Sequence, residues 1–232
     1  MAAPHPDDGV TMSICSRSRL LALLACLLVP AAAFAQAAVG RPAAPQDLGQ
    51  RLKDIERDPK LLDQYYRNGR KVAAFCANCH GEGGNSLKPD IPNLAGQNTA
   101  YLLEQVRQFG DGRRRNEFME GLIKAMSTDE KLAVAVYYAS QEVDHKPAAN
   151  LKLAMQGKTY YDKICFRCHG EQGRGSERYA RVAGQQAEYL SRTLKRYRDG
   201  TGGRIDPLMA ANTRTMKDED IAAVVAYIAS MK

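Results

Sequence analysis

The sequence predicts an all-α chain made of two tandem domains that are related by duplication. Two six-residue segments share one pattern, CANCHG at 76–81 and CFRCHG at 165–170, and they begin 89 residues apart. The similarity extends far beyond these segments, with an offset that stays between 88 and 90 residues. Apolar residues recur at helical spacing in both copies, and the alternating pattern typical of strands is not found. The sequence therefore contains one supersecondary unit that has been duplicated.

Each unit is predicted to contain three helices joined by glycine-rich loops. A short helix precedes each cysteine motif, and a second helix follows the Ala-Gly-Gln tripeptide that both copies contain. A third helix begins at Ser127, where Glu130 three residues later completes a capping box. The loops 81–98 and 170–185 are long for domains of about 90 residues. Long loops without secondary structure are usually functional, so both are expected to surround a bound group.

The N-terminal 35 residues match a secretory signal peptide. Arg17 and Arg19 precede an apolar run at 20–29, and small residues then favour cleavage after Ala35. An uncleaved membrane anchor and a lipoprotein site at Cys26 are the alternatives. Proline and glutamine interrupt the longer apolar stretch, and the lipoprotein motif is atypical, so both are less favoured.

The rest of the chain is predicted to divide into an N-terminal extension, two domains and a linker between them. Leu48, Leu52 and Ile55 share one helical face in a segment that lies outside the repeat, and this helix is expected to pack on the first domain. The predicted division is a signal peptide at 1–35, an N-terminal extension with a short helix at 36–65, a first domain at 66–146, a linker at 147–150 and a second domain at 151–232.

The chain is basic, with a formal net charge of +7. Residues 151–232 carry 15 basic and nine acidic residues, whereas residues 36–150 are nearly balanced. The basic residues are scattered, which favours a solvated surface or an acidic protein partner over nucleic acid.

The cysteines indicate the chemistry. Removal of the signal peptide leaves four, all in the two repeated motifs: Cys76, Cys79, Cys165 and Cys168. Two thiols three residues apart, followed by histidine, are typical of a c-type haem attachment site. The thiols would bond to two vinyl groups of one porphyrin, and His80 or His169 would ligate its iron. A redox disulfide leaves the histidines unexplained, and zinc needs four ligands at each site.

The second iron ligand is predicted to be methionine. After export the one spare histidine is His145, which lies near the linker and cannot serve two sites. Met119 and Met209 follow their haem histidines by 39 and 40 residues, and Met126 and Met216 form a second matching pair. Methionine often only fills a core, and the later pair precedes the third helix, where an apolar staple is expected. The earlier pair, expected in the loop after the second helix, is therefore assigned to iron.

The segments CANCHGEGGNS, PNLAGQNTAYLLEQVRQF and GRRRNEFM resemble class I cytochromes c, and the tandem arrangement over 66–232 resembles the cytochrome c4 family. That resemblance implies two class I cytochrome c domains, each wrapped around one covalent haem c, with the axial methionine at Met119 and Met209. It also implies that the carbonyl of Pro92 accepts a hydrogen bond from His80. The second copy departs from this pattern, because Ala180 replaces the proline.

The resemblance implies a periplasmic electron carrier of the respiratory chain, which shuttles single electrons from a quinol-oxidising complex to a terminal oxidase. No catalytic residue is assigned, and the protein is expected not to be an enzyme. Its expected partners are donor and acceptor proteins with an acidic docking face, with membrane-surface or oxidase association as a further possibility and no nucleic acid. The alternatives are a cytochrome subunit bound permanently to a dehydrogenase or oxidase complex and, less favoured, a two-haem peroxidase.

Overall fold

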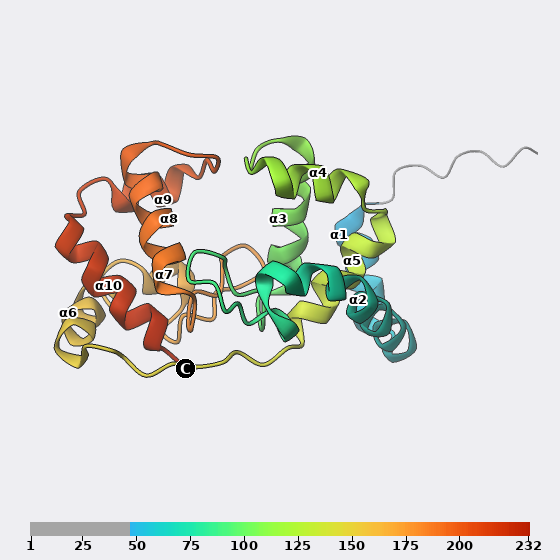
Figure 1. The fold of residues 1–232 in the computed structure, drawn as a ribbon, viewed down its shortest axis with the longest axis horizontal. Coiled ribbons are helices and arrows are strands. Elements are labelled where there is room, and N and C mark those ends of the chain that lie inside the picture. The colour runs from blue at the N-terminus through green and yellow to red at the C-terminus, as the bar shows by residue number, and fades with distance from the viewer. Residues whose placement is uncertain (1–46) are drawn as a thin grey trace, which may run out of the picture. The chain divides into compact units, whose positions relative to one another are not determined.

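The structure, a computed structural model, describes residues 47–232, and every regular element in that range is a helix (Figure 1). The predicted signal peptide and its cleavage site after Ala35 lie outside the described residues. The nearest approach to a strand in the described range is an isolated antiparallel bridge between Arg114 and Arg204. None of the described helices combines the length and apolar character needed to cross a membrane.

The first half of the described chain is built around the crossing of two helices, α2 and α5. Leu132 and Ala135 of α5 are almost fully buried, and they share one apolar cluster with Leu52 and Ile55 of the extension. The extension therefore packs on the first domain, as predicted. The elements are α1 (Leu48–Arg57), α2 (Pro59–His80), the 3-10 helix η1 (Glu82–Gly84), α3 (Thr99–Asp111), α4 (Glu117–Ala125) and α5 (Thr128–Ala139).

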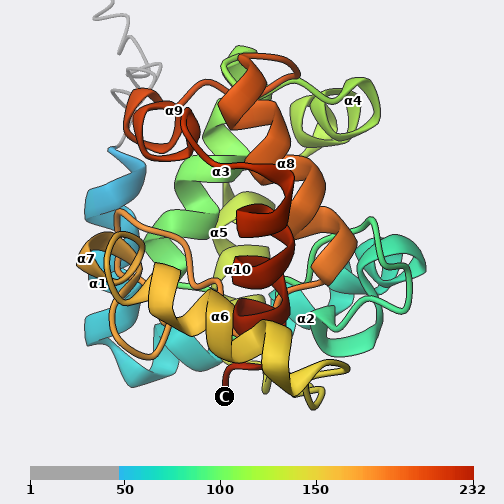
Figure 2. The same cartoon turned by 90° about the vertical axis from the view of Figure 1, so that its left-hand side faces the viewer.

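The second half repeats this plan, with α10 crossing α6 (Figure 2). Tyr161, Ile221 and Val224 are fully buried where these two helices meet. The elements are α6 (Leu151–Tyr161), α7 (Phe166–His169), α8 (Ala187–Asp199), α9 (Pro207–Thr213) and α10 (Asp218–Ser230).

The structure corrects the predicted length of the helix before the first cysteine motif, which was expected to be short. Helix α2 is 22 residues long and runs without a break from the extension into the motif. Asp58 caps it by accepting a hydrogen bond from the backbone N–H of Lys60 at 2.8 Å, and Pro59 occupies its first turn. The boundary expected after residue 65 therefore falls inside a helix. In the second half α6 ends at Tyr161, and the separate helix α7 begins directly after Cys165, the first residue of the motif.

Two glutamines, each from the repeated Ala-Gly-Gln tripeptide, join the two halves. The side-chain amide of Gln97 accepts from the backbone N–H of Arg181 at 2.7 Å and donates to its carbonyl at 2.9 Å. Gln185 makes the same pair of bonds with the backbone of Asn93, at 2.7 and 3.0 Å. Each glutamine thus bonds to the residue two positions before the tripeptide of the other half. We call these two contacts the glutamine clamps.

Candidate haem-binding sites

His80 ends α2 and is buried, with an exposed fraction of 9%. Its Nδ1 lies 2.9 Å from the carbonyl oxygen of Pro92, so Nδ1 carries the donated proton and Nε2 remains free. Burial lowers the pKa of His80, and the positive charge of Arg114 acts in the same direction. The side chain is therefore held as the neutral, oriented imidazole that iron binds.

His169 ends α7 and has the same arrangement in the second half. Its Nδ1 lies 2.8 Å from the carbonyl oxygen of Ala180, so the replacement of proline at this position keeps the acceptor. Burial lowers the pKa of His169 as well, and the charge of Arg204 contributes to this shift. The two histidine side chains are therefore oriented in the same way, although the residue that supplies the carbonyl is proline in one half and alanine in the other.

The four motif cysteines are all free thiols. Cys76 and Cys79 lie on the last turns of α2, where residues three apart occupy neighbouring positions on one helix face. Cys165 precedes the first residue of α7, and Cys168 lies within that helix. Burial raises the pKa of the Cys165 thiol to about 11. The Cys165 thiol is therefore protonated near neutral pH. In each half the two motif cysteines precede the motif histidine directly in the sequence.

The structure corrects the expected placement of Met119 and Met209. They were predicted in a loop, but they lie in the short helices α4 and α9. The side chains of Asn116 and Asp206 begin these helices, each accepting a hydrogen bond from the backbone N–H of its methionine at 3.0 Å. Capping residues three positions before each methionine were a visible signal for these helices.

The second methionine pair lies in the apolar cores. Met216 has an exposed fraction of 5% and belongs to the core cluster of the second half, and Met126 packs against that of the first. Both are thus accounted for by packing. Met119 and Met209 belong to neither cluster. The spare histidine, His145, has its Nδ1 2.8 Å from the carbonyl oxygen of Met231.

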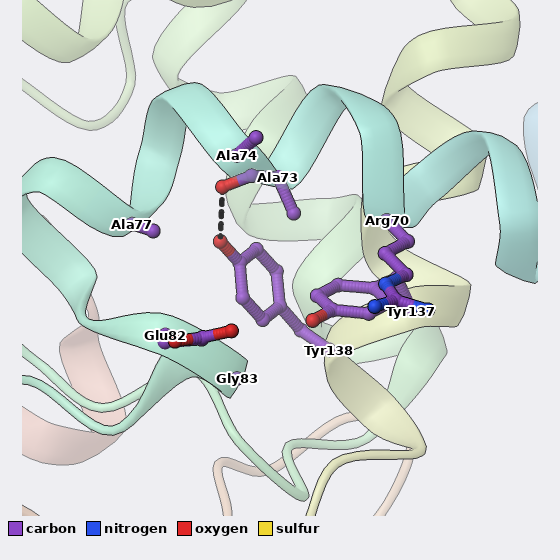
Figure 3. Close-up of a pocket in the computed structure, with 8 residues that line it drawn as sticks. All are labelled: Arg70, Ala73, Ala74, Ala77, Glu82, Gly83, Tyr137 and Tyr138. Carbon is purple, nitrogen blue, oxygen red and sulfur yellow. Dashed lines mark hydrogen bonds between the residues drawn. The ribbon is translucent and has the colours of Figure 1, made fainter.

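A cavity of about 290 Å³ lies beside the first cysteine motif (Figure 3). Its walls are the α2 face that carries Ala73 and Ala77 and the rings of Tyr137 and Tyr138. The hydroxyl of Tyr138 approaches the carbonyl oxygen of Ala73 at 3.5 Å. Neither His80 nor a methionine lines this cavity, so it is separate from the candidate iron ligands.

The donor set of each half fits a covalently attached haem. Each half offers two thiols on one helical turn, a buried neutral imidazole fixed through Nδ1, and a methionine on a short capped helix that core packing does not use. Reasoning from sequence missed Arg114 and Arg204, whose charges reach the two histidines. Their equivalent places in the repeat, 90 residues apart, were the signal that could have found them.

Comparison with known proteins identifies the family. The cytochrome c family model matches residues 154–232. The chain is 34% identical to cytochrome c4 of Pseudomonas aeruginosa, over 69% of this chain and 85% of that protein. It is 33% identical to a thiosulfate dehydrogenase electron acceptor of Thiomonas intermedia, over 68% and 79%. The crystal structure of reduced cytochrome c4 from Pseudomonas stutzeri superposes with a TM-score of 0.66 at 28% identity, covering 72% of this chain and 98% of that one.

These relatives confirm the predicted fold class of two tandem class I cytochrome c domains. They also support covalently bound haem c as the cofactor and electron transfer as the general function. The duplicated motif, the paired histidine geometry and the similarity over most of the chain agree with one another. The chain therefore belongs to the cytochrome c4 family.

Proposed function

We propose that this chain is an exported electron carrier of the periplasm, which passes single electrons between larger redox proteins. The observation that carries the proposal is the duplicated site, in which a buried histidine at a helix end is oriented by a backbone carbonyl beside two free thiols. Two such sites in one chain form a two-centre relay.

The residues proposed to hold the cofactors come from the repeated motif, and the orientation of the two histidines supports them. In the first half Cys76 and Cys79 bind the porphyrin covalently, and His80 and Met119 are the iron ligands. The carbonyl of Pro92 fixes the ring orientation of His80 and increases its basicity through the hydrogen bond to Nδ1.

The second half uses the equivalent set. Cys165 and Cys168 bind the porphyrin, and His169 and Met209 are the ligands. When bound, a haem with two axial protein ligands supplies one-electron Fe(III)/Fe(II) cycling. With a histidine and a methionine from each half as its ligands, each iron would have no position left for a substrate. This arrangement favours a carrier over a peroxidase.

Spectra of axial-ligand variants test the assignment. We expect the ferric holoprotein to show the weak far-red absorption band that marks sulfur–iron ligation. Met119→Ala and Met209→Ala should each remove half of this band. The matched controls are Met126→Leu and Met216→Leu, which alter core methionines and should keep it. If the full band persists in both alanine variants, the ligand assignment fails.

The electron donor is proposed to be either a quinol-oxidising complex or a dehydrogenase. The dehydrogenase is supported by the Thiomonas relative, which is named as an electron acceptor of thiosulfate dehydrogenase. Stopped-flow reduction of the purified holoprotein by each donor separates the two. The donor that reduces both haems faster at equal concentration is favoured, and failure of both donors contradicts the carrier role in either pathway. Stable co-elution with a dehydrogenase or oxidase in gel filtration would instead indicate a permanent subunit.

A further inference from the structure

Each glutamine clamp bonds to the same peptide group that orients a candidate iron ligand. In the first half this group joins Pro92 to Asn93. Its carbonyl oxygen lies 2.9 Å from Nδ1 of His80, and its N–H donates to the side-chain oxygen of Gln185 at 2.7 Å. Gln185 belongs to the second half. A single peptide group therefore connects the histidine of one half to a side chain of the other.

The second half has the reciprocal arrangement. The carbonyl of the peptide group between Ala180 and Arg181 lies 2.8 Å from Nδ1 of His169, and its N–H donates to the side-chain oxygen of Gln97 at 2.7 Å. The histidine and the residue that supplies its carbonyl are 12 positions apart in the first half and 11 in the second. The two loops thus differ in length, yet both clamps reach the corresponding peptide group.

The geometry of a peptide group couples its two ends. Its atoms are coplanar and its C=O and N–H are trans, so a bond that holds the N–H also fixes the direction of the C=O. A hydrogen bond accepted from the N–H also polarises the group and strengthens its carbonyl as an acceptor. The side-chain oxygen of each glutamine therefore acts on a histidine that it does not touch.

Each glutamine amide is itself held in one orientation. The side-chain oxygen of Gln185 also accepts from the backbone N–H of Gln186 at 2.9 Å, and that of Gln97 accepts from the backbone N–H of Asn98 at 3.1 Å. Gln186 and Asn98 directly precede α8 and α3. The NH2 group of each amide donates to the carbonyl of the clamped residue, as described above. Three hydrogen bonds therefore define where each glutamine oxygen lies.

We propose that Gln185 is the positioning residue for His80 and that Gln97 is the positioning residue for His169. Each half then sets the electron-donating strength of the imidazole that ligates iron in the other half. This inference rests on the proposed function, because it requires both histidines to be iron ligands.

The sign of the effect follows from the basicity of the ligand. A carbonyl that accepts strongly from Nδ1–H makes the imidazole more basic. A more basic ligand stabilises ferric iron, which carries one more positive charge than ferrous iron, and so lowers the reduction potential. Glutamine is neutral, so its replacement by alanine removes no charge. Loss of a glutamine should therefore raise the potential of the haem in the opposite half.

Two measurements on the two-haem holoprotein test the proposal. Redox titration followed by NMR assigns a potential to each half, and we expect Gln185→Ala to raise that of the first half alone and Gln97→Ala that of the second half alone. Deuterium exchange of the histidine ring Nδ1–H is measured in the ferrous protein. It should become about tenfold faster or more at the opposite histidine only, because loss of a buried hydrogen bond changes a local opening equilibrium by about this factor.

The crossed pattern makes each alanine variant a control for the other, and Asn98→Ala is a further control. The side chain of Asn98 crosses between the halves to the carbonyls of Arg174 and Tyr179, at 3.0 and 3.4 Å, without bonding to either of the two clamped peptide groups. Its removal should leave both potentials and both exchange rates unchanged. A shift in Asn98→Ala as large as that in the glutamine variants contradicts the proposal, because it assigns the effect to general loosening.

A glutamate variant separates the two hydrogen bonds of a clamp. Gln185→Glu keeps an oxygen that can accept from the N–H of Asn93, but an ionised carboxylate cannot donate to its carbonyl. We expect the exchange at His80 to stay slow in this variant. Exchange as fast as in Gln185→Ala overturns the role of the N–H bond.

A merely structural role of the clamps gives a different result. It predicts lower thermal stability with unchanged potentials, or equal changes in both halves, and either outcome overturns the proposal. If the alanine variants do not retain haem, Gln185→Met and Gln97→Met decide by the same criteria, because methionine keeps the side-chain length. The proposed function is tested separately, because the far-red band and the uptake of two electrons per wild-type chain do not depend on the outcome for the glutamines.

Discussion

Gly69 of α2 touches Ala133 of α5 so closely that a Cβ on the glycine would lie 2.1 Å from the alanine carbonyl oxygen. Gly157 and Ala223 repeat this relationship in the second half, at 1.9 Å. The helix crossing that supports each cysteine motif therefore depends on a missing side chain, because a methyl group would collide with backbone that cannot rotate away.

Replacing either of these glycines by alanine should destabilise its half. Overpacking typically costs about 1–3 kcal/mol, which exceeds the gain of up to about 1 kcal/mol in helix propensity. Chemical unfolding of Gly69→Ala and Gly157→Ala holoprotein measures the effect. Gly121→Ala in α4 is the control, because a Cβ there meets no atom within 4 Å. Equal stability of Gly69→Ala and Gly121→Ala would contradict the close crossing.

Breaking one glutamine clamp should loosen the junction between the halves. Gln97→Ala leaves the N–H and carbonyl of Arg181 without their partners, at a cost of about 1–3 kcal/mol if water cannot replace them. We expect lower thermal stability and faster proteolysis at the connection 141–150. Gln50→Ala removes an exposed glutamine bonded within one helix and should change neither. Unchanged proteolysis in Gln97→Ala would show that the clamps do not hold the halves together.

Association with an acidic partner should weaken as salt increases. The excess of positive charge in residues 151–232 accelerates encounter at low ionic strength, and screening removes this advantage. Stopped-flow electron-transfer rates measured across an ionic-strength series should therefore fall steadily. A flat dependence excludes electrostatic steering. Self-exchange between two copies of the chain is the control, because like charges give the opposite salt dependence.

Asp129 should make a small pH-dependent contribution to stability. Hydrogen bonding from Tyr65, at 2.7 Å, lowers the pKa of Asp129, and the ion pair with Arg51 acts in the same direction. A carboxyl whose pKa is lowered on folding stabilises the protein above its unfolded pKa, and this contribution is lost as pH falls through the folded pKa.

Asp129→Asn should therefore unfold more easily than wild type near neutral pH, by less than about 1 kcal/mol because the group is exposed. The difference should begin to shrink below roughly pH 4, where the unfolded carboxyl becomes protonated, and should vanish once the pH is below the lowered pKa of Asp129 in the folded protein. Denaturant titration at several pH values measures it. Asp63→Asn is the control, because its partner lies one turn along the same helix. A difference that persists in acid would contradict an electrostatic origin.

Much of the fold was accessible from the sequence because its signals are local. Ser127 and Glu130 form the predicted capping box, and Leu52 and Ile55 lie on the buried face of α1 as their spacing indicated. The placement of Met119 and Met209 was wrong, although Asn116 and Asp206 are ordinary capping residues. The sequence predicts loops in the short segments between those caps and the next helix, whereas the structure has α4 and α9 there.

The contacts between the halves could not be read from local patterns. Gln97 and Arg114 are polar residues in helical or loop contexts, and nothing in their own segments shows what they face. Their partners in the other half lie 75 or more residues away, so only a three-dimensional arrangement reveals them. The metal ligands themselves stay predictions from spacing, and the structure adds the hydrogen bonds and burial that orient two of them.

The glutamine clamps bond only to main-chain atoms of the partner residue. The partner is asparagine at 93 in one half and arginine at 181 in the other, yet the bonds have nearly the same lengths. The clamps themselves do not restrict the side chain at the contacted position. At 93 the restriction comes from the asparagine side chain, which donates to the carbonyl of Gly184 at 3.0 Å and accepts from the side-chain amide of Gln186 at 3.0 Å. After the ancestral unit was copied, position 181 could therefore take a different side chain from position 93 while the clamp at each position kept both of its hydrogen bonds.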